Sequence, residues 1–224
     1  MNFPATLFAA EWLWLCWLIL AVVVVYCVRM VLREDWRWLC DTRHTHAFLG
    51  ALVCLAMMWG LKAGVKPGLN LHLIGATLLT LMADAPLAIL GLLLVLAGIT
   101  LNGQADWQSY ALNGLVMCVL PVISSRVLMH WIERRLPAHF FVYIFVGAFF
   151  NAALSILILG AVTNGLMLAS GTYTLDLLME EYTLFFLLLA FSEAWLTGIV
   201  ITGMVVYRPH WVVSFQDSRY LANK

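Results

Sequence analysis

Charged residues are scarce in this sequence: they make up 11% of its 224 residues, whereas 64% are hydrophobic. A typical soluble domain is about one-quarter charged and about half apolar. The apolar excess continues along the whole chain, which excludes a soluble domain of useful size and predicts an all-α, multi-pass membrane protein. The formal net charge is zero, so composition gives no sign of nucleic-acid binding, and the lipid bilayer is the expected surroundings.

Motifs of enzymes and of nucleotide binding are also missing. The sequence has no HExxH, no P-loop, no serine–histidine pair and no CxxC spacing among its five cysteines. We therefore expect no enzymatic activity and no tightly bound cofactor. If the protein moves a solute with the energy of ATP, another subunit must supply the ATPase. The N-terminus has no basic region before its apolar run, so we interpret it as a retained first span rather than a signal peptide.

Seven apolar segments predict seven transmembrane helices, since one span needs about 20 apolar residues. Asp84 and Pro86 interrupt the apolar region 71–101, which predicts two spans there, the first of them unusually short. We expect residues 1–224 to form a single integral membrane domain. The predicted spans are about 11–32, 46–64, 71–84, 86–101, 110–132, 140–168 and 177–207.

Lysine and arginine predict the orientation, because cytoplasmic loops are enriched in these residues. With seven spans, the basic clusters that follow the first, fifth and seventh spans all fall on one side, and the other side has only Lys62 and Lys66. The N-terminus is therefore expected outside and the C-terminus inside, in the inner (cytoplasmic) membrane of a cell. The clusters are Arg29, Arg33, Arg37 and Arg43, then Arg134 and Arg135, then Arg208, Arg219 and Lys224.

Two polar side chains in the predicted spans are candidates for function. Glu193 lies roughly in the middle of the last span, where a charge costs about 2.5–3.5 kcal/mol on insertion scales. It either lines a pathway or cavity, or forms hydrogen bonds between helices. Asn113, near the start of the fifth span, has the same two interpretations. Asn113 and Asn151 are also candidate interhelical partners of Glu193.

His72 stands at the outer end of the short third span, after the glycine-containing stretch "GLNL". A neutral imidazole at this position can ligate a divalent transition metal. It can equally form a hydrogen bond near the outer interface. The residue pattern alone leaves both interpretations open.

Three segments, in this order, resemble the CbiM/NikM family. "GLNLHLIGATLLTLMADAPLAILGLLLVL" resembles the family's His-Leu-Leu-Gly-Ala motif, which precedes a short helix and a second apolar run. "ALNGLVMCVLPVI" resembles its Asn-hydrophobic-Asn-Met segment, here with Asn113 and Met117. "FSEAWLTGIVITGMVVYRPHWV" resembles its last helix, which ends in Arg-Pro. The similarity extends over about residues 46–212.

This resemblance implies the substrate-capturing permease component of an energy-coupling-factor ABC importer for cobalt or nickel. The implied partners are ATPase subunits and a coupling transmembrane subunit. In the family, the metal ligands are the N-terminal amine, a histidine at position two with the intervening backbone nitrogen, and the histidine of the motif. Carried over to this chain, the resemblance implies a site for transported Co²⁺ or Ni²⁺ at Met1, Asn2 and His72.

The first residues depart from the family pattern. The chain begins Met1-Asn2-Phe3, so an amide replaces an imidazole, which is a nitrogen donor of the kind that nickel and cobalt prefer. The amine and amide nitrogens of the first residues remain available as donors. Two hypotheses therefore stand: a metal-uptake permease component, or a membrane scaffold or assembly protein that retains the fold without binding metal.

Overall fold

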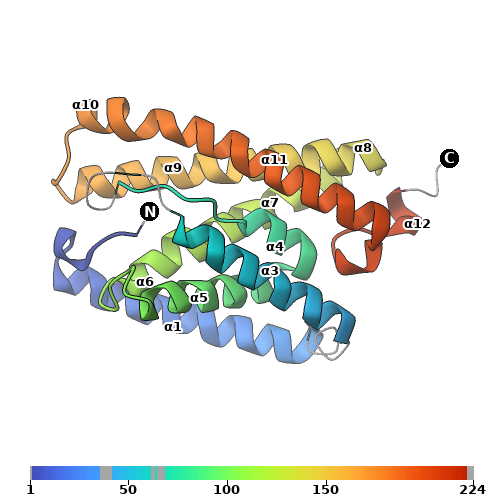
Figure 1. Ribbon diagram of the computed structural model, residues 1–224, viewed down its shortest axis with the longest axis horizontal. Coiled ribbons are helices and arrows are strands. Elements are labelled where there is room, and N and C mark those ends of the chain that lie inside the picture. The colour runs from blue at the N-terminus through green and yellow to red at the C-terminus, as the bar shows by residue number, and fades with distance from the viewer. Residues whose placement is uncertain (1, 36–41, 62–63, 65–68, 221–224) are drawn as a thin grey trace.

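The regular elements of the protein are helices, as the sequence predicts (Figure 1). The structure is a computed structural model, and it describes residues 2–35, 42–61, 64 and 69–220. The candidate ligand Met1 and the basic residues Arg37, Lys62, Lys66 and Lys224 lie outside these residues. The described part of the chain therefore tests the helices and the surroundings of Asn2 and His72.

Four continuous helices in the described residues are long and apolar enough to cross a membrane, and two shorter apolar helices accompany them. Short π-helical stretches interrupt the long helices without ending them. The long helices are α1 (Ala10–Met30) with η2 (Val31–Asp35); α6 (Tyr110–Asn113), η3 (Gly114–Val119) and α7 (Leu120–Arg135); α8 (Phe140–Val142), η4 (Tyr143–Phe150) and α9 (Asn151–Ala169); and α10 (Leu175–Leu178), η5 (Met179–Thr183) and α11 (Leu184–Tyr207). The shorter ones are α3 (Thr42–Gly60) and α5 (Ala85–Leu101).

The helix predicted over the third span, 71–84, is shorter than expected. Helix α4 (Ala76–Ala83) has only eight residues, about 12 Å, and all of them are buried. It cannot begin earlier, because Gly75 has a φ of 70°, which a right-handed helix does not contain. The predicted interruption is confirmed: Asp84 has a φ of 64°, and α5 begins at the next residue. The second predicted span also ends early, since α3 stops at Gly60.

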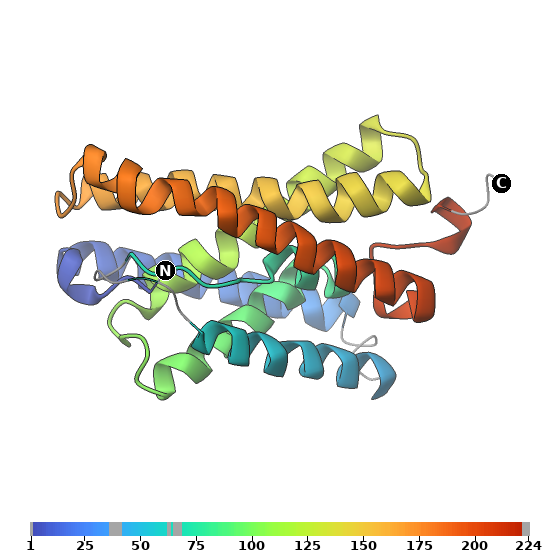
Figure 2. The ribbon, with the colours of Figure 1, turned by 45° about the horizontal axis from the view of Figure 1, so that its top comes forward.

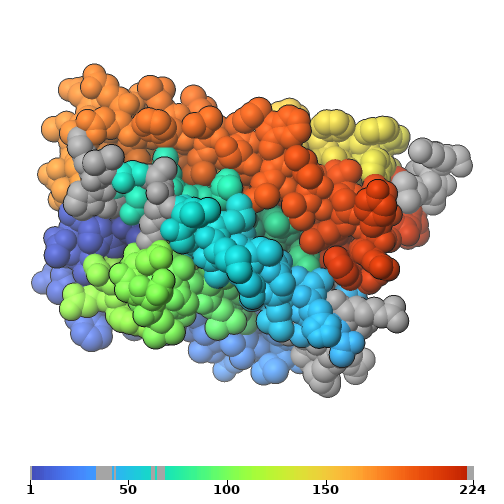
Figure 3. Space-filling view, viewed as in Figure 1, coloured from blue at the N-terminus to red at the C-terminus, as the bar shows by residue number. Residues whose placement is uncertain are grey.

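Helix α4 occupies the centre of the molecule. It contacts α3, α5, α7, α9 and α11. Helices α9 and α11 lie side by side along much of their length, while α1, α3 and α5 lie on the other side of α4 (Figures 1 and 2). In the space-filling view α3 and α11 form much of the visible face and leave little of α4 exposed (Figure 3). The short helix is therefore surrounded by protein rather than by lipid.

The chain after α11 returns to the C-terminal end of α4. This segment contains η6 (Pro209–Trp211) and α12 (Asp217–Tyr220). The N–H groups of Val213 and Ser214 donate to the carbonyls of Met82 and Leu81, at 3.1 and 3.2 Å, and the Ser214 hydroxyl also donates to Leu81 at 2.8 Å. Carbonyls in the last turn of a helix have no partner within the helix. The C-terminal segment therefore satisfies acceptors that the short helix leaves open.

Candidate metal-capture site

His72 lies in an extended segment that leads into α4. Leu71, His72 and Leu73 all line an apolar groove of about 620 Å³ between α3 and α11, and His72 is only 3% exposed. The imidazole lies against the Trp59 ring, with 4.8 Å between centroids, and its Nδ1 is 3.2 Å from the Leu73 carbonyl. A proton on Nδ1 would donate to that carbonyl and leave the lone pair on Nε2, the nitrogen that could then ligate a cation.

Glu193 fixes the end of the His72 segment. Its carboxylate accepts the N–H of Ile74 and that of Gly75, the latter at 3.0 and 3.2 Å from its two oxygens. These are N–H groups at the start of α4, where the helix dipole favours a negative charge. Glu193 is 1% exposed, so this interaction is shielded from solvent. The expectation that Asn113 and Asn151 are its partners is wrong, since both form their hydrogen bonds elsewhere.

The turn at Gly75 requires glycine for two reasons. Its φ is positive, and a Cβ atom would lie 2.4 Å from Cδ2 of Leu55 on α3. The same helix supplies Trp59, whose indole N–H donates to the Ile74 carbonyl at 3.2 Å. Helix α3 therefore packs the turn from one side while Glu193 of α11 binds it from the other.

The N-terminal segment lies beside the His72 segment. The backbone N–H of Asn2 donates to Oδ1 of Asn70 at 2.8 Å, two residues before His72. Phe3 is fully buried, and Asn113 pairs with its backbone in both directions: Oδ1 accepts the Phe3 N–H at 2.8 Å, and Nδ2 donates to the Phe3 carbonyl at 3.2 Å. Asn113 thus holds the segment as a neighbouring strand would. The N-terminus and His72 are brought to the same end of the molecule.

The Asn2 side chain is also held in one orientation. Its Nδ2 donates to the backbone carbonyl of Gln104 at 3.1 Å. The residue is 7% exposed, and its Oδ1 is buried without a hydrogen-bond partner among the described residues. Because buried polar atoms are normally hydrogen-bonded, this oxygen is unusual. The sequence shows that Asn2 departs from the family motif, but it does not reveal how the side chain is hydrogen-bonded.

Sequence reasoning missed the residues that join the two segments. Asn70 precedes His72 by two, the spacing that places two side chains on the same side of an extended strand, so the alternation in "LNLHL" carried a usable signal. Gln104 acts through its carbonyl, which no side-chain pattern reveals. In the described part of the chain no three His, Cys, Asp or Glu side chains are grouped to hold a metal ion. A cation at His72 therefore needs amine, amide or carbonyl donors.

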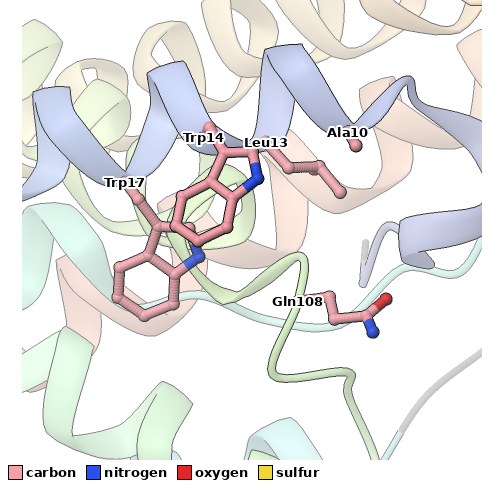
Figure 4. Close-up of a pocket in the computed structure, with 5 residues that line it drawn as sticks. All are labelled: Ala10, Leu13, Trp14, Trp17 and Gln108. Atoms are coloured by element: carbon pink, nitrogen blue, oxygen red, sulfur yellow. The ribbon is translucent and has the colours of Figure 1, made fainter.

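A second hollow lies on the α1 side. It has a volume of about 320 Å³ and is lined by Ala10, Leu13, Trp14, Trp17 and Gln108. Figure 4 shows the indole rings of Trp14 and Trp17 projecting from α1 on the side where Gln108 lies. Among the described residues, none with an ionisable side chain lines this hollow. Tryptophans at a helix end are typical of the membrane–water interface.

The fold and the site define an all-helical membrane protein that holds an imidazole and its own N-terminal segment at one end of the helices. The chain belongs to the CbiM family, the cobalt uptake substrate-specific transmembrane region, whose model matches residues 2–211. It is thus a multi-pass membrane component of transition-metal uptake and not an enzyme, and its cargo is a bound metal ion.

Two solved structures have a similar fold. One, described as a truncated transition metal transporter, is 17% identical with a TM-score of 0.77, and the alignment covers 92% of this chain and 99% of that one. The other, described as a transition metal transporter, is 18% identical with a TM-score of 0.75, covering 91% and 92%. A comparison with curated proteins gave no match.

Proposed function

We propose that the protein captures Co²⁺ or Ni²⁺ outside the cell through the Met1 amine, Asn2 and His72. The observation that carries this proposal is the hydrogen bond from the Asn2 N–H to Asn70, which holds residue 2 against the segment that contains His72. The imidazole is buried with its Nδ1 3.2 Å from a backbone carbonyl, and the adjoining N-terminal segment contributes amide groups. These are donors that a transition-metal ion accepts together with an imidazole.

We further propose seven crossings in a single domain over residues 1–224, with the N-terminus outside. In this arrangement α4 and its extended approach, 69–75, form the third crossing. Figures 1 and 2 support this topology: η1 (Ala5–Leu7), the α5–α6 loop and the α9–α10 loop lie at one end of the molecule, opposite α12 and the α7–α8 loop. Arg134, Arg135 and Arg208 are at that opposite end, where the positive-inside rule places them in the cytoplasm.

Glu193 and Asn113 serve, in this proposal, as interhelical anchors rather than as pathway groups. Both form hydrogen bonds with backbone atoms, one in the segment that contains His72 and the other in the N-terminal segment. Glu193 binds the turn after His72, and Asn113 binds Phe3. Their hydrogen bonds account for two buried polar side chains that would otherwise be costly in a membrane protein.

The proposed partners are ATPase subunits and a coupling transmembrane subunit of an energy-coupling-factor importer, in the inner (cytoplasmic) membrane. Membership of a family of substrate-specific uptake components supports this, because such a component is one part of a larger transporter. Co-purification with an ATPase tests the assignment. Metal uptake that persists when ATP is depleted would contradict it.

Metal binding by purified protein tests the site. The protein, with its native N-terminus and a C-terminal tag, is dialysed against Co²⁺ or Ni²⁺, and the bound metal is measured. We expect His72→Ala to lower the affinity by at least about tenfold, since the imidazole supplies the strongest side-chain donor. His130→Ala, on the exposed surface of α7, is the matched control and should bind as the unchanged protein does.

Equal metal binding by the His72→Ala variant and the unchanged protein would exclude His72 as a ligand. An N-terminal extension gives a second readout, because it removes the Met1 amine from its position. We expect it to weaken metal binding while leaving the helical content, measured by circular dichroism, unchanged.

A further inference from the structure

Two histidines from distant parts of the chain meet at the end of the molecule opposite His72. His44 is in the first turn of α3, and His210 is the middle residue of η6, which follows α11. Their ring centroids are 5.7 Å apart, and the ring planes are inclined at 56°. Trp59, which contacts His72, lies near the other end of α3, about 22 Å along the helix axis from His44. The histidine pair is therefore separate from the capture site.

The two histidines are carried by elements that contact each other. Helix α3 and η6 are neighbours, and the start of α3 and the end of α11 lie at the same end of the molecule (Figures 1 and 2). The η6 turn is closed by the N–H of Trp211, which donates to the Arg208 carbonyl at 2.9 Å. The N–H of Val213 then donates to a carbonyl of α4 at 3.1 Å, so the chain is fixed on both sides of His210. The backbone that carries this imidazole is thereby held beside α3.

The separation of the two rings suits a shared metal ion. A metal–nitrogen bond is about 2.0–2.1 Å long, so two imidazoles on one ion have centroids roughly 4.5–6 Å apart. His44 is half-buried and His210 is exposed, so an ion can reach the pair from the aqueous side. In the part of the chain that the structure describes, no third His, Cys, Asp or Glu side chain joins them, which leaves the remaining coordination positions to water. Neutral imidazole is a ligand that suits nickel and its neighbours among the divalent transition metals.

We propose that His44 and His210 together bind a divalent transition-metal ion on the cytoplasmic face, as a second site for the cation that the protein helps to import. The binding chemistry needs only the two imidazoles, whereas the cytoplasmic location and the identity of the cargo rest on the proposed function. Two imidazoles and water form a weak, exchangeable site, which suits release better than capture. An ion in this position also joins α3 to the segment that bonds to the C-terminal end of α4.

Nickel binding by a protein that already lacks His72 tests the pair. The His72→Ala protein, with a C-terminal tag that contains no histidine, is dialysed against Ni²⁺, and the bound metal is measured. His44→Ala and His210→Ala are added to it singly and together, and His44→Gln is measured beside His44→Ala because it keeps a polar side chain of similar size. His46→Ala is the matched control, since His46 is exposed and lies two residues further along α3, on a different face.

We expect each single substitution to weaken the remaining Ni²⁺ binding by at least about tenfold, as the loss of a metal-site group does. The double substitution should weaken it no further, because one imidazole alone does not form the site. The His46→Ala control should bind as its parent does. Thermal unfolding gives a second readout: Ni²⁺ should raise the unfolding temperature of the His72→Ala protein but not that of variants that lack His44 or His210.

The outcomes distinguish this inference from the proposed function. If His72→Ala alone removes all Ni²⁺ binding, the second site does not exist and the capture site stands. If the effects of His44→Ala and His210→Ala add up in the double variant, the two imidazoles bind separately and the inference is overturned. If both variants lose Ni²⁺ binding while His72→Ala in the otherwise unchanged protein has no effect, the inference stands and the proposed capture at His72 fails.

Discussion

Asn113 shows how one side chain can position a segment distant in sequence. Its amide pairs with both polar groups of the Phe3 backbone across 110 residues, and it also donates to Ser109 Oγ at 3.2 Å, one turn earlier in its own helix. The residue is completely buried. An amide is suited to this task because it contains one acceptor and two donors. Asn113 thereby holds the N-terminal segment in place.

Replacing Asn113 should release this segment. Asn113→Leu has a similar size but leaves the Phe3 N–H and carbonyl without partners, at a cost of about 1–3 kcal/mol for each buried group. We expect faster amide hydrogen exchange at Phe3 and weaker Co²⁺ binding. Asn151→Leu is the matched control, because Asn151 is also buried but bonds to Ser125 and Ser155. Unchanged exchange at Phe3 in Asn113→Leu would show that other contacts hold the N-terminus.

Helix α4 depends on hydrogen bonds from other segments of the chain. Eight residues are too few for a stable isolated helix in water. Glu193 binds the N–H groups of Ile74 and Gly75, the two residues just before the helix, and Val213 and Ser214 bind its last carbonyls. The hydrogen bonds at both ends of α4 thus come from the final third of the chain. The turn at His72 and the C-terminal segment are joined through one short buried helix.

Removing the Glu193 carboxylate should destabilise this element. Glu193→Leu leaves the N–H groups of Ile74 and Gly75 unsatisfied, which costs about 1–3 kcal/mol each. Glu193→Gln keeps one acceptor oxygen and should cost less. Thermal unfolding in detergent measures the stability, which should decrease from the unchanged protein to Glu193→Gln and further to Glu193→Leu. Glu180→Leu, an exposed acid in η5, is the control. A Glu193→Leu protein as stable as the control would show that the carboxylate does not support α4.

At the scale of the whole molecule, local patterns predicted most of the helices but not all of their ends. Apolar length revealed most of the helices, and Asp84 with Pro86 correctly indicated the break before α5. The extended residues 71–75 were wrongly predicted as helix because they are apolar. What prevents helix there is the conformation of Gly75 and a carboxylate 118 residues away.

The arrangement of the site was less predictable than the identity of His72. The sequence pointed to the imidazole through its motif, but the hydrogen bonds that tie its segment to the N-terminal segment and to α11 join residues 68 and 119 positions apart. The C-terminal return to Leu81 spans 133 positions. Such pairs are determined by packing of the complete fold, and a single sequence contains no periodic signal for them.

The central claim is that His72 and the N-terminal segment meet a metal ion on the outer side of the membrane. Vesicles of defined orientation test it most directly. Membranes containing the unchanged protein or His72→Ala are prepared right-side-out and inside-out, depleted of ATP, and exposed to radioactive Co²⁺ that is then washed away. We expect His72-dependent binding in right-side-out vesicles only. Binding that depends on His72 in inside-out vesicles alone would contradict it.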